Sequence, residues 1–286
     1  MSAGFRCLVC GAGESEPVWL RCRDYYLGKP FEVDYHRCLG CQLLQQHPVP
    51  GDISAFYEDY PIHARKSRLY DALRWLVMSP VYYDLRGQPP RTRLLDYGCG
   101  DGGYLEMQRG RGYELAGYEA DAGQAGRLGQ RLALPVYSDI DWLFAAHEGR
   151  TDVVTMHFVV EHLTNLDLGF RAARRLLRPD GVFYFVIPHA DSLEARLFGR
   201  KWHNLDPPRH VSFLQPAHVA RLAERNGFGV ERHRPVPFPN GFAASLPVVI
   251  SGRFRFSLFA LALPLGIAFS RLSPTGSRAY WLRRLP

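Results

Sequence analysis

Residues 94–121 read LLDYGCGDGGYLEMQRGRGYELAGYEAD: an apolar run that ends in an acid, a cluster of glycines, a helical stretch, and a second apolar run that ends in another acid. This order predicts a strand, a tight turn, a helix and a second strand. The glycines let the backbone pass close to a ligand, and the free amides of the helix starting near Gly103 suit a negatively charged group. Glu119, at the end of the second strand, can accept both hydroxyls of a ribose. The combination favours a nucleoside-containing cofactor over a structural loop.

Strands and helices continue to alternate after this unit. Helices are expected at 122–132, 165–177 and 215–226, and strands at 136–138, 152–158, 182–187 and 228–233. Strands separated by helices predict a mostly parallel α/β sheet, doubly wound, with helices on both faces and with ligands at the carboxyl ends of the strands. The acids and histidine expected near those ends are Asp96, Glu119, Asp139 and His157.

Four of the six cysteines form two close pairs, Cys7-x2-Cys10 and Cys38-x2-Cys41. This is the spacing of a tetrahedral Zn²⁺ site, because a two-residue gap lets one turn present two sulfurs to one ion. Four thiolates leave no open position on the metal, so the site is interpreted as structural. Buried free thiols and a redox Cys-x-x-Cys pair are the alternatives. The surrounding segment is too short to bury its own core, so the metal is expected to supply much of its folding free energy.

Composition narrows the class of protein. The chain has 286 residues, 47% hydrophobic and 22% charged, which fits about two globular domains and excludes a disordered or collagen-like chain. The net charge of +7 suits an anionic partner, but the arginines are scattered, and no aromatic and basic stripe supports nucleic acid. The first residues contain no long apolar run after a basic head, so we expect a cytoplasmic protein with reduced cysteines.

The segment from Arg93 to His233 resembles the class I S-adenosylmethionine-dependent methyltransferases. The motifs that carry the resemblance are LLDYGCGDGG, AGYEAD, the Ser138-Asp139 step, DVVTMHFVVEHL and RLLRPDGVFYFVIP. The resemblance implies a seven-stranded Rossmann-like sheet. A dehydrogenase is the competing interpretation of such a glycine turn, but the order Asp-Tyr-Gly-Cys-Gly-Asp-Gly and the later Glu161-His162 pair favour methyl transfer.

The resemblance also implies a cofactor-binding set. Glu119 would hold the ribose hydroxyls, and Asp139 would approach the adenine amine. The residues expected around the methionine part and the pocket wall are Asp96, Gly98, Cys99, Gly100 and His157.

The cysteine pairs, followed by residues 57–60, resemble the zinc-binding front end of bacterial methyltransferases that act in sugar, polysaccharide and natural-product pathways. The expected acceptor is therefore an oxygen or carbon of a sugar, glycolipid or related metabolite. An aromatic or quinone-like small molecule is an alternative acceptor. A zinc-ribbon binding module on a scaffold that no longer catalyses is a second alternative, against which the intact Asp96, Gly98, Gly100 and Glu119 argue.

Two histidines are candidates for removing a proton from the acceptor, since a base with a pKa near neutrality is wanted. His162 follows Glu161 at the mouth of the expected pocket, and His210 lies in the segment KWHNLDPPRHVSF, where similar proteins carry a Pro-x-His. Each is balanced by a structural interpretation, in which it caps or packs a loop. Some related quinone O-methyltransferases bind a metal through Glu-x-x-Glu-His, but Phe158 stands at the first Glu position, which argues against a catalytic metal.

The chain is divided by composition into five parts. Residues 1–50 form the zinc segment, 51–90 a helical linker or substrate cap, 91–239 the core, 240–275 an apolar insertion, and 276–286 a last strand antiparallel to 228–233. The insertion is broken by Pro264 and Gly266, so we expect no simple membrane span. A lid or oligomer contact competes with peripheral contact at the inner face of the membrane, and the oligomeric state is left open.

Overall fold

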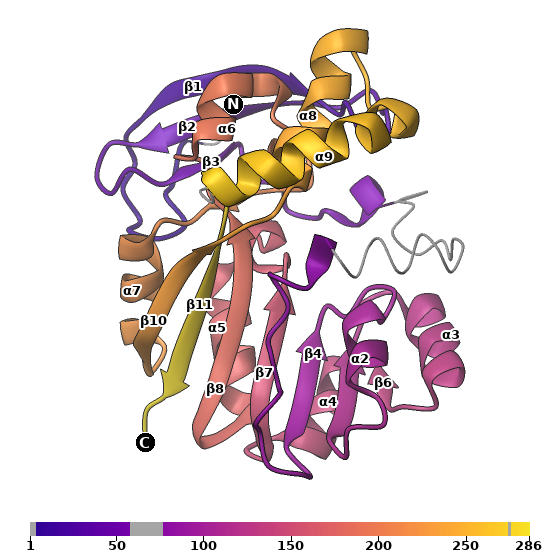
Figure 1. The fold of residues 1–286 in the computed structure, drawn as a ribbon. Helices are drawn as coiled ribbons and strands as arrows, with labels where there is room; N and C mark the ends of the chain where they lie inside the picture. Colours follow the sequence, from indigo (N-terminus) through magenta and orange to yellow (C-terminus); the bar gives the residue numbers. More distant parts are fainter. Residues whose placement is uncertain (1–3, 58–76, 274–275) are drawn as a thin grey trace.

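The computed structural model describes residues 4–57, 77–273 and 276–286. It contains a seven-stranded sheet in the order β10-β11-β8-β7-β4-β5-β6. Its strands are β4 (Arg93–Tyr97), β5 (Glu114–Tyr118), β6 (Val136–Tyr137), β7 (Thr151–His157), β8 (Leu177–Pro188), β10 (Phe228–Val236) and β11 (Ser277–Arg284). β4 to β8 run parallel, and β11 lies antiparallel between β8 and β10. The prediction of a doubly wound, mostly parallel Rossmann-like sheet is confirmed (Figure 1).

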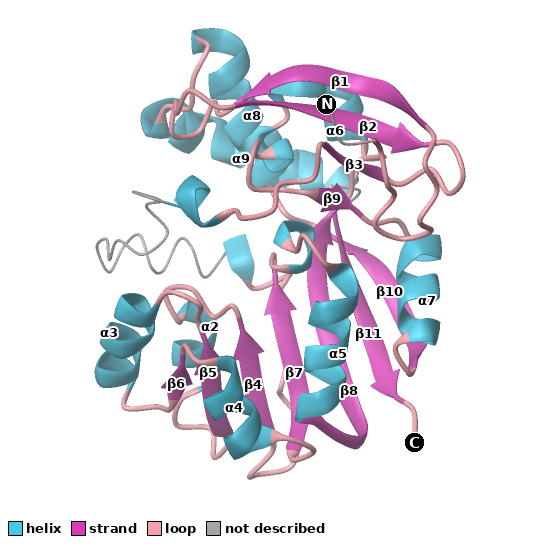
Figure 2. Ribbon diagram, turned by 180° about the vertical axis from the view of Figure 1, so that it is seen from behind, coloured by secondary structure: helices cyan, strands magenta, loops and turns pink. Residues whose placement is uncertain are grey.

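Helices cover both faces of this sheet (Figure 2). They are α2 (Gly103–Gln108), α3 (Ala122–Leu132), α4 (Ile140–His147), α5 (Leu166–Leu176) and α7 (Pro216–Arg225). Helix α5 begins where Asn165 accepts the amide of Leu168, a side-chain cap for a free N–H group. Its apolar stripe is buried, and Phe170 meets Phe183 of β8 with ring centroids 5.5 Å apart. The predicted helices at 122–132, 165–177 and 215–226 match α3, α5 and α7 to within one residue at each end.

Strand β8 differs from the expectation at its start. The sequence predicts a turn at 178–181 before the strand, but β8 begins at Leu177 and includes these residues. The register with β7 is irregular here, between Thr151 and Val153, and Asp180 has φ 61°. A Cβ at Gly181 would lie 2.9 Å from the side chain of Leu177, so the absent side chain permits this bulged start.

Residues 15–47 contribute three strands to a second, smaller sheet, β1 (Ser15–Arg23), β2 (Glu32–Cys38) and β3 (Leu44–His47). A fourth strand, β9 (Ser212–Phe213), comes from a distant part of the sequence and pairs antiparallel with β3. The boundary expected at residue 50 is therefore crossed by a shared sheet. Residues 58–76 of the linker or cap expected at 51–90 lie outside the described residues, which include 51–57, with the 3-10 helix Ser54–Tyr57, and 77–90.

The region expected as an apolar insertion folds as two helices, α8 (Asn240–Ser251) and α9 (Phe256–Leu272), between β10 and β11. They lie with the small sheet and α6 (Leu193–Phe198) at the end of the large sheet toward which β4 and β7 point (Figures 1 and 2). Among the described residues, none of the helices combines the length and the apolar content that crossing a membrane requires.

Candidate functional site

The four paired cysteines converge at the edge of the small sheet. Sγ of Cys7 lies 3.5 Å from Sγ of Cys41, and Sγ of Cys10 lies 3.5 Å from Sγ of Cys38. All four sulfurs lie within 4.8 Å of one another, and a tetrahedral ion with bonds of about 2.3 Å needs sulfurs about 3.8 Å apart. None of the six cysteines, all in the described part of the chain, forms a disulfide. These residues fit a closed zinc site.

The surroundings of the four sulfurs fit a metal as well. The amide of Cys10 points to Sγ of Cys7 at 3.5 Å, and a Cβ at Gly40 would lie 3.6 Å from Sγ of Cys10. His218 of α7 accepts the amide of Gln215 at Nδ1, so its Nε2–H donates to the carbonyl of Cys41 at 2.7 Å. That bond ties the cysteine cluster to the large domain.

The glycine turn after β4 lies beside the acid that ends β5. Glu119 Oε2 accepts the amide of Gly100 at 2.9 Å, so this half-buried carboxylate sits directly against the turn. Gly98 has φ +75°, and a Cβ there would lie 2.7 Å from Cγ2 of Val159. Only glycine fits this close approach without strain. The side chain of Cys99 instead points into the core, where its Sγ would lie 2.8 Å from a Cβ at Gly117.

Asp96 is buried and bound to two residues of β7. Its Oδ1 accepts the hydroxyl of Thr155 at 2.6 Å and lies 3.2 Å from Nδ1 of His157. Nε2 of His157 accepts the amide of Tyr83 at 3.3 Å, so Nδ1 carries the hydrogen and donates to Asp96. The sequence places both side chains at strand ends, and the structure joins them in one network that fixes the imidazole.

Asp139 lies at the expected end of β6 but already has a local role. Its Oδ1 accepts the amides of Asp141 and Trp142 at 2.8 and 3.1 Å, and the residue is the N-cap of α4. The carboxylate is exposed at this helix start.

Glu161, His162 and His210 come together although 48 positions separate the last two. Possible ligand atoms of all three lie within 4.8 Å of one another. His162 and His210 meet edge to face with centroids 4.6 Å apart, and Nε2 of His210 lies 3.9 Å from Oε1 of Glu161. The carboxyl oxygens of Glu161 are buried and have no hydrogen-bond partner among the described residues. Burial raises the pKa of Glu161 well above its ordinary value.

Both histidines are held by backbone carbonyls through Nδ1. His162 Nδ1 lies 2.9 Å from the carbonyl of Arg209 and 2.7 Å from the hydroxyl of Tyr57, and His210 Nδ1 lies 2.7 Å from the carbonyl of Asn204. A carbonyl can only accept, so Nδ1 of His210 carries a hydrogen and its Nε2 is left with the lone pair. His162 hydrogen-bonds to the carbonyls of both Arg209 and Phe158. Burial lowers the pKa of both, that of His210 to about 3, so both rings are neutral at pH 7.

The segment that carries His210 is fixed by the small sheet. Gln46 Nε2 donates to the carbonyl of Pro208 at 2.6 Å, and the hydroxyl of Tyr35 donates to that of His210 at 2.8 Å. The guanidinium of Arg209 is fully buried between Asp24 and Asp206. The sequence analysis missed Asp24, Tyr35 and Tyr57 as supports of the site, because each acts on residues more than a hundred positions away.

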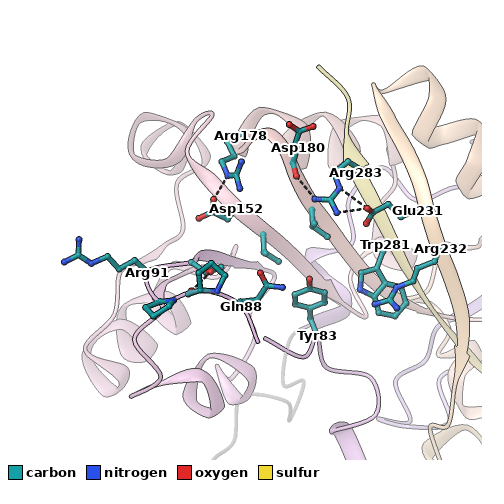
Figure 3. Close-up of a pocket in the computed structure, with 15 residues that line it drawn as sticks. Tyr83, Gln88, Arg91, Asp152, Arg178, Asp180, Glu231, Arg232, Trp281 and Arg283 are labelled. Atoms are coloured by element: carbon teal, nitrogen blue, oxygen red, sulfur yellow. Dashed lines mark hydrogen bonds and ion pairs between the residues drawn. The ribbon is translucent and has the colours of Figure 1, made fainter. Parts of the chain in front are cut away.

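A cavity of about 660 Å³ lies at the end of the large sheet where β7 and β8 begin, opposite to the end that carries His162 and His210 (Figure 3). Four of its charged groups form ion pairs, Arg178 with Asp152 and Arg283 with Glu231. Arg232 stacks over the ring of Trp281 at 4.2 Å. This cavity contains none of the residues that the sequence analysis singled out.

Comparison with known proteins identifies the large domain. A family described as "Methyltransferase domain" matches residues 67–233. The ubiquinone biosynthesis O-methyltransferase of Thiobacillus denitrificans is 29% identical over 172 residues, which cover 56% of this chain and 71% of that protein. The malonyl-[acyl-carrier protein] O-methyltransferase of Serratia marcescens is 30% identical over 136 residues, 47% of this chain and 52% of that protein.

Among solved structures, the geranyl diphosphate C-methyltransferase from Streptomyces coelicolor A3(2) superposes with a TM-score of 0.50 and 16% identity. The alignment covers 83% of this chain and 89% of that one, and at this identity it supports the fold alone.

Proposed function

The chain belongs to the methyltransferase domain family and is an S-adenosylmethionine-dependent enzyme, and from that premise we propose that it moves a methyl group to an oxygen or carbon of a sugar, glycolipid or related metabolite. The cluster of Glu161, His162 and His210 carries the proposal. It offers two neutral imidazoles and a carboxyl group in a buried setting, a set of uncharged hydrogen-bonding groups that suits a polyhydroxylated neutral acceptor.

The glycine turn and Glu119 form the cofactor side of the proposed site. Glu119 would give up its hydrogen bond with the amide of Gly100 and accept the two ribose hydroxyls instead. A carboxylate suits this role because each of its two oxygens can accept a hydrogen bond from one of two neighbouring donors. Asp96 and His157, which are hydrogen-bonded to each other, would lie next to the methionine part of the cofactor. Asp139, the N-cap residue of α4, would lie near the adenine. When bound, S-adenosylmethionine supplies an electrophilic methyl group on a positively charged sulfur.

The two histidines form the acceptor side. Nε2 of His210 is unprotonated at pH 7 and can accept the proton of an acceptor hydroxyl as the methyl group is transferred, and Tyr57 and the backbone carbonyls keep both rings oriented. The carboxyl group of Glu161, 3.9 Å from Nε2 of His210, would hydrogen-bond to the acceptor and hold it beside this imidazole. Positioning of the acceptor by these groups contributes as well, since transfer needs the nucleophile in line with the methyl group.

We assign the four-cysteine cluster to one structural Zn²⁺ ion. Cys7, Cys10, Cys38 and Cys41 would bind it as thiolates, and the ion would hold the turn that supports β3. Strand β3 in turn pairs with β9, two residues after His210. The metal would thus stabilise the acceptor side without touching the acceptor.

A quinone-like or other aromatic acceptor is the second candidate. The similarity to the ubiquinone biosynthesis O-methyltransferase favours it. Phe158, with its ring 4.9 Å from that of Phe238, stands where a metal-binding Glu of some quinone O-methyltransferases would be, which disfavours it.

An acceptor search distinguishes the two. Extracts rich in sugars and glycolipids, and extracts rich in quinone precursors, are incubated with the protein and S-adenosylmethionine carrying a deuterated methyl group, and products that gain the label are identified by mass spectrometry. Label in sugar-containing products that requires His162 or His210 supports the proposal. Label confined to aromatic products would favour the second candidate, and release of no S-adenosylhomocysteine with either extract would count against both.

A further inference from the structure

Helices α8 and α9 pack closely against each other. The rings of Phe242 and Phe269 stack with centroids 4.3 Å apart, and a Cβ at Gly266 would lie 2.7 Å from Cβ of Ala243. Ser245 of α8 accepts the amide of His203, and the amide of Phe254 donates to the carbonyl of Tyr25. The hairpin is therefore fixed to both domains, and its outer face is a defined surface.

That outer face is apolar. The side chains of Leu261, Leu265 and Leu272 are 77%, 63% and 88% exposed, and their spacing places them on one side of α9. Ile250, at the end of α8, is 70% exposed. Leu193 and Leu197 form a smaller exposed pair on α6, whereas on α9 three large apolar side chains share one face in contact with water, which marks a contact surface.

The charged side chains of the hairpin itself are all of one sign. From Arg232 to the last residue the sequence contains eight arginines and no Asp or Glu. Arg253 and Arg255 are exposed between the two helices, and Arg271 is exposed at the end of α9. None of the three forms an ion pair within the described ranges 4–57, 77–273 and 276–286. The surface that covers this face should therefore supply negative charge beside an apolar interior.

We propose that the outer face of α8 and α9, with Leu261, Leu265 and Leu272 between Arg253, Arg255 and Arg271, docks on a bilayer that contains anionic lipids. The leucines enter the boundary between head groups and acyl chains, and the guanidinium groups bind the phosphates. A second copy of the chain fits less well, because a two-fold contact through this face would bring arginines together with no acidic residue of the hairpin to pair with them.

The test measures flotation of the full chain with vesicles of phosphatidylcholine alone and with vesicles containing about 30 mol% phosphatidylglycerol. We expect binding to the anionic vesicles only, weakened by added salt. Replacing Leu261, Leu265 and Leu272 together by Gln should lower the bound fraction at least about tenfold. Leu168→Gln on α5 is the matched control, because that leucine is 58% exposed but lies outside the hairpin, and it should change nothing.

A second variant, which combines Arg253→Gln, Arg255→Gln and Arg271→Gln, should also weaken binding and reduce its dependence on salt. Binding of S-adenosylhomocysteine is followed by calorimetry on the same preparations, so that loss of the fold or of the cofactor site is recognised separately. A protein that binds the cofactor product but ignores both vesicle types, or that binds neutral vesicles equally, overturns the proposal. So does a stable dimer in light scattering that the three leucine replacements dissociate.

Discussion

The guanidinium of Arg209 donates two hydrogen bonds to the carboxylate of Asp24, at 2.9 and 3.1 Å, with both side chains fully buried. Asp206 accepts two more from the same group. The three charges join the small sheet to the segment that carries His210, and water is excluded from them. A buried charge that loses its partner costs far more than an exposed one.

Removing Arg209 should therefore be severe. Arg209→Ala leaves two buried carboxylates unpaired, and we expect the free energy of unfolding to fall by about 3–5 kcal/mol. Denaturation with urea, followed by circular dichroism, measures the change. Arg86→Ala, which breaks an exposed pair with Asp84, is the control and should leave the unfolding midpoint unchanged. Equal effects of the two substitutions would contradict this account of the buried cluster.

Glu194 makes stability depend on pH. Its buried carboxyl accepts Nε1–H of Trp202 at 3.0 Å, and burial raises its pKa to about 7. A carboxyl whose pKa is raised in the folded state favours the protonated form there, so its destabilising effect grows as pH rises from about 4.5 to 7 and is complete above that. Glu194→Gln should match the wild-type stability at pH 5 and exceed it at pH 8, by at most about 3 kcal/mol. Thermal melts of both proteins at the two pH values test this, and a variant that is equally destabilised at both would refute it.

The four-cysteine cluster should contain zinc. We expect about one Zn²⁺ per chain by mass spectrometry of metals in the purified protein, and loss of the ion with a lower melting temperature after chelation. Cys38→Ser should abolish the bound metal. Cys22→Ala, at a buried cysteine outside the cluster, should keep it. Metal retained by Cys38→Ser at the wild-type level would exclude the assigned ligand set.

Gly98 should be more sensitive than other glycines with the same backbone. Gly98 and Gly110 both have φ +75°, but a Cβ would meet Val159 at Gly98 and nothing within 4 Å at Gly110. Gly110→Ala should cost about 1 kcal/mol of backbone strain. Gly98→Ala should cost more, and it should also weaken S-adenosylmethionine binding by displacing the turn. Calorimetric titration of both variants with S-adenosylmethionine compares their affinities. Equal affinities would contradict a role of the Gly98 turn in cofactor binding.

Replacement of the two candidate bases, His162 and His210, should lower the turnover rate and leave the affinity for the cofactor unchanged. His162→Ala and His210→Ala should each lower kcat about 10²–10⁴-fold if the ring removes a proton, with S-adenosylmethionine binding preserved. His233→Ala, remote at β10, is the control. Because burial lowers the pKa of both rings, that of His210 to about 3, the rate should not fall by half near the ordinary histidine pKa of about 6.5. A rate that halves near the ordinary histidine pKa of about 6.5 would point to a different, exposed base.

Sequence reasoning located local features well, because their causes are local. The helix at 122–132 is confirmed, since Asp121 caps it by accepting the amide of Gln124, and an αL residue, Ala133, ends it. The glycine turn and the acid after β5 were found for the same reason, as both follow from neighbouring residues. The roles assigned to the individual site residues stay predictions.

The contacts that build the acceptor side were beyond the sequence. The two-residue strand β9 has no pattern of its own and is defined only by its pairing with β3. Burial of the pair Asp24 and Arg209 runs against the usual exposure of charged residues, so only the packed structure reveals it. The contact between Tyr57 and His162, which are 105 positions apart, likewise depends on the tertiary fold.

The shared small sheet has a consequence for how the protein is made. Strand β3 ends at His47, but its neighbour in the sheet, β9, begins at Ser212. On the ribosome, the open edge of β3 stays without this strand until the following 165 residues have been synthesised, and unpaired strand edges are prone to wrong pairing in that period. Early binding of zinc by the four cysteines would keep the segment that carries β1 to β3 compact until β9 has been synthesised.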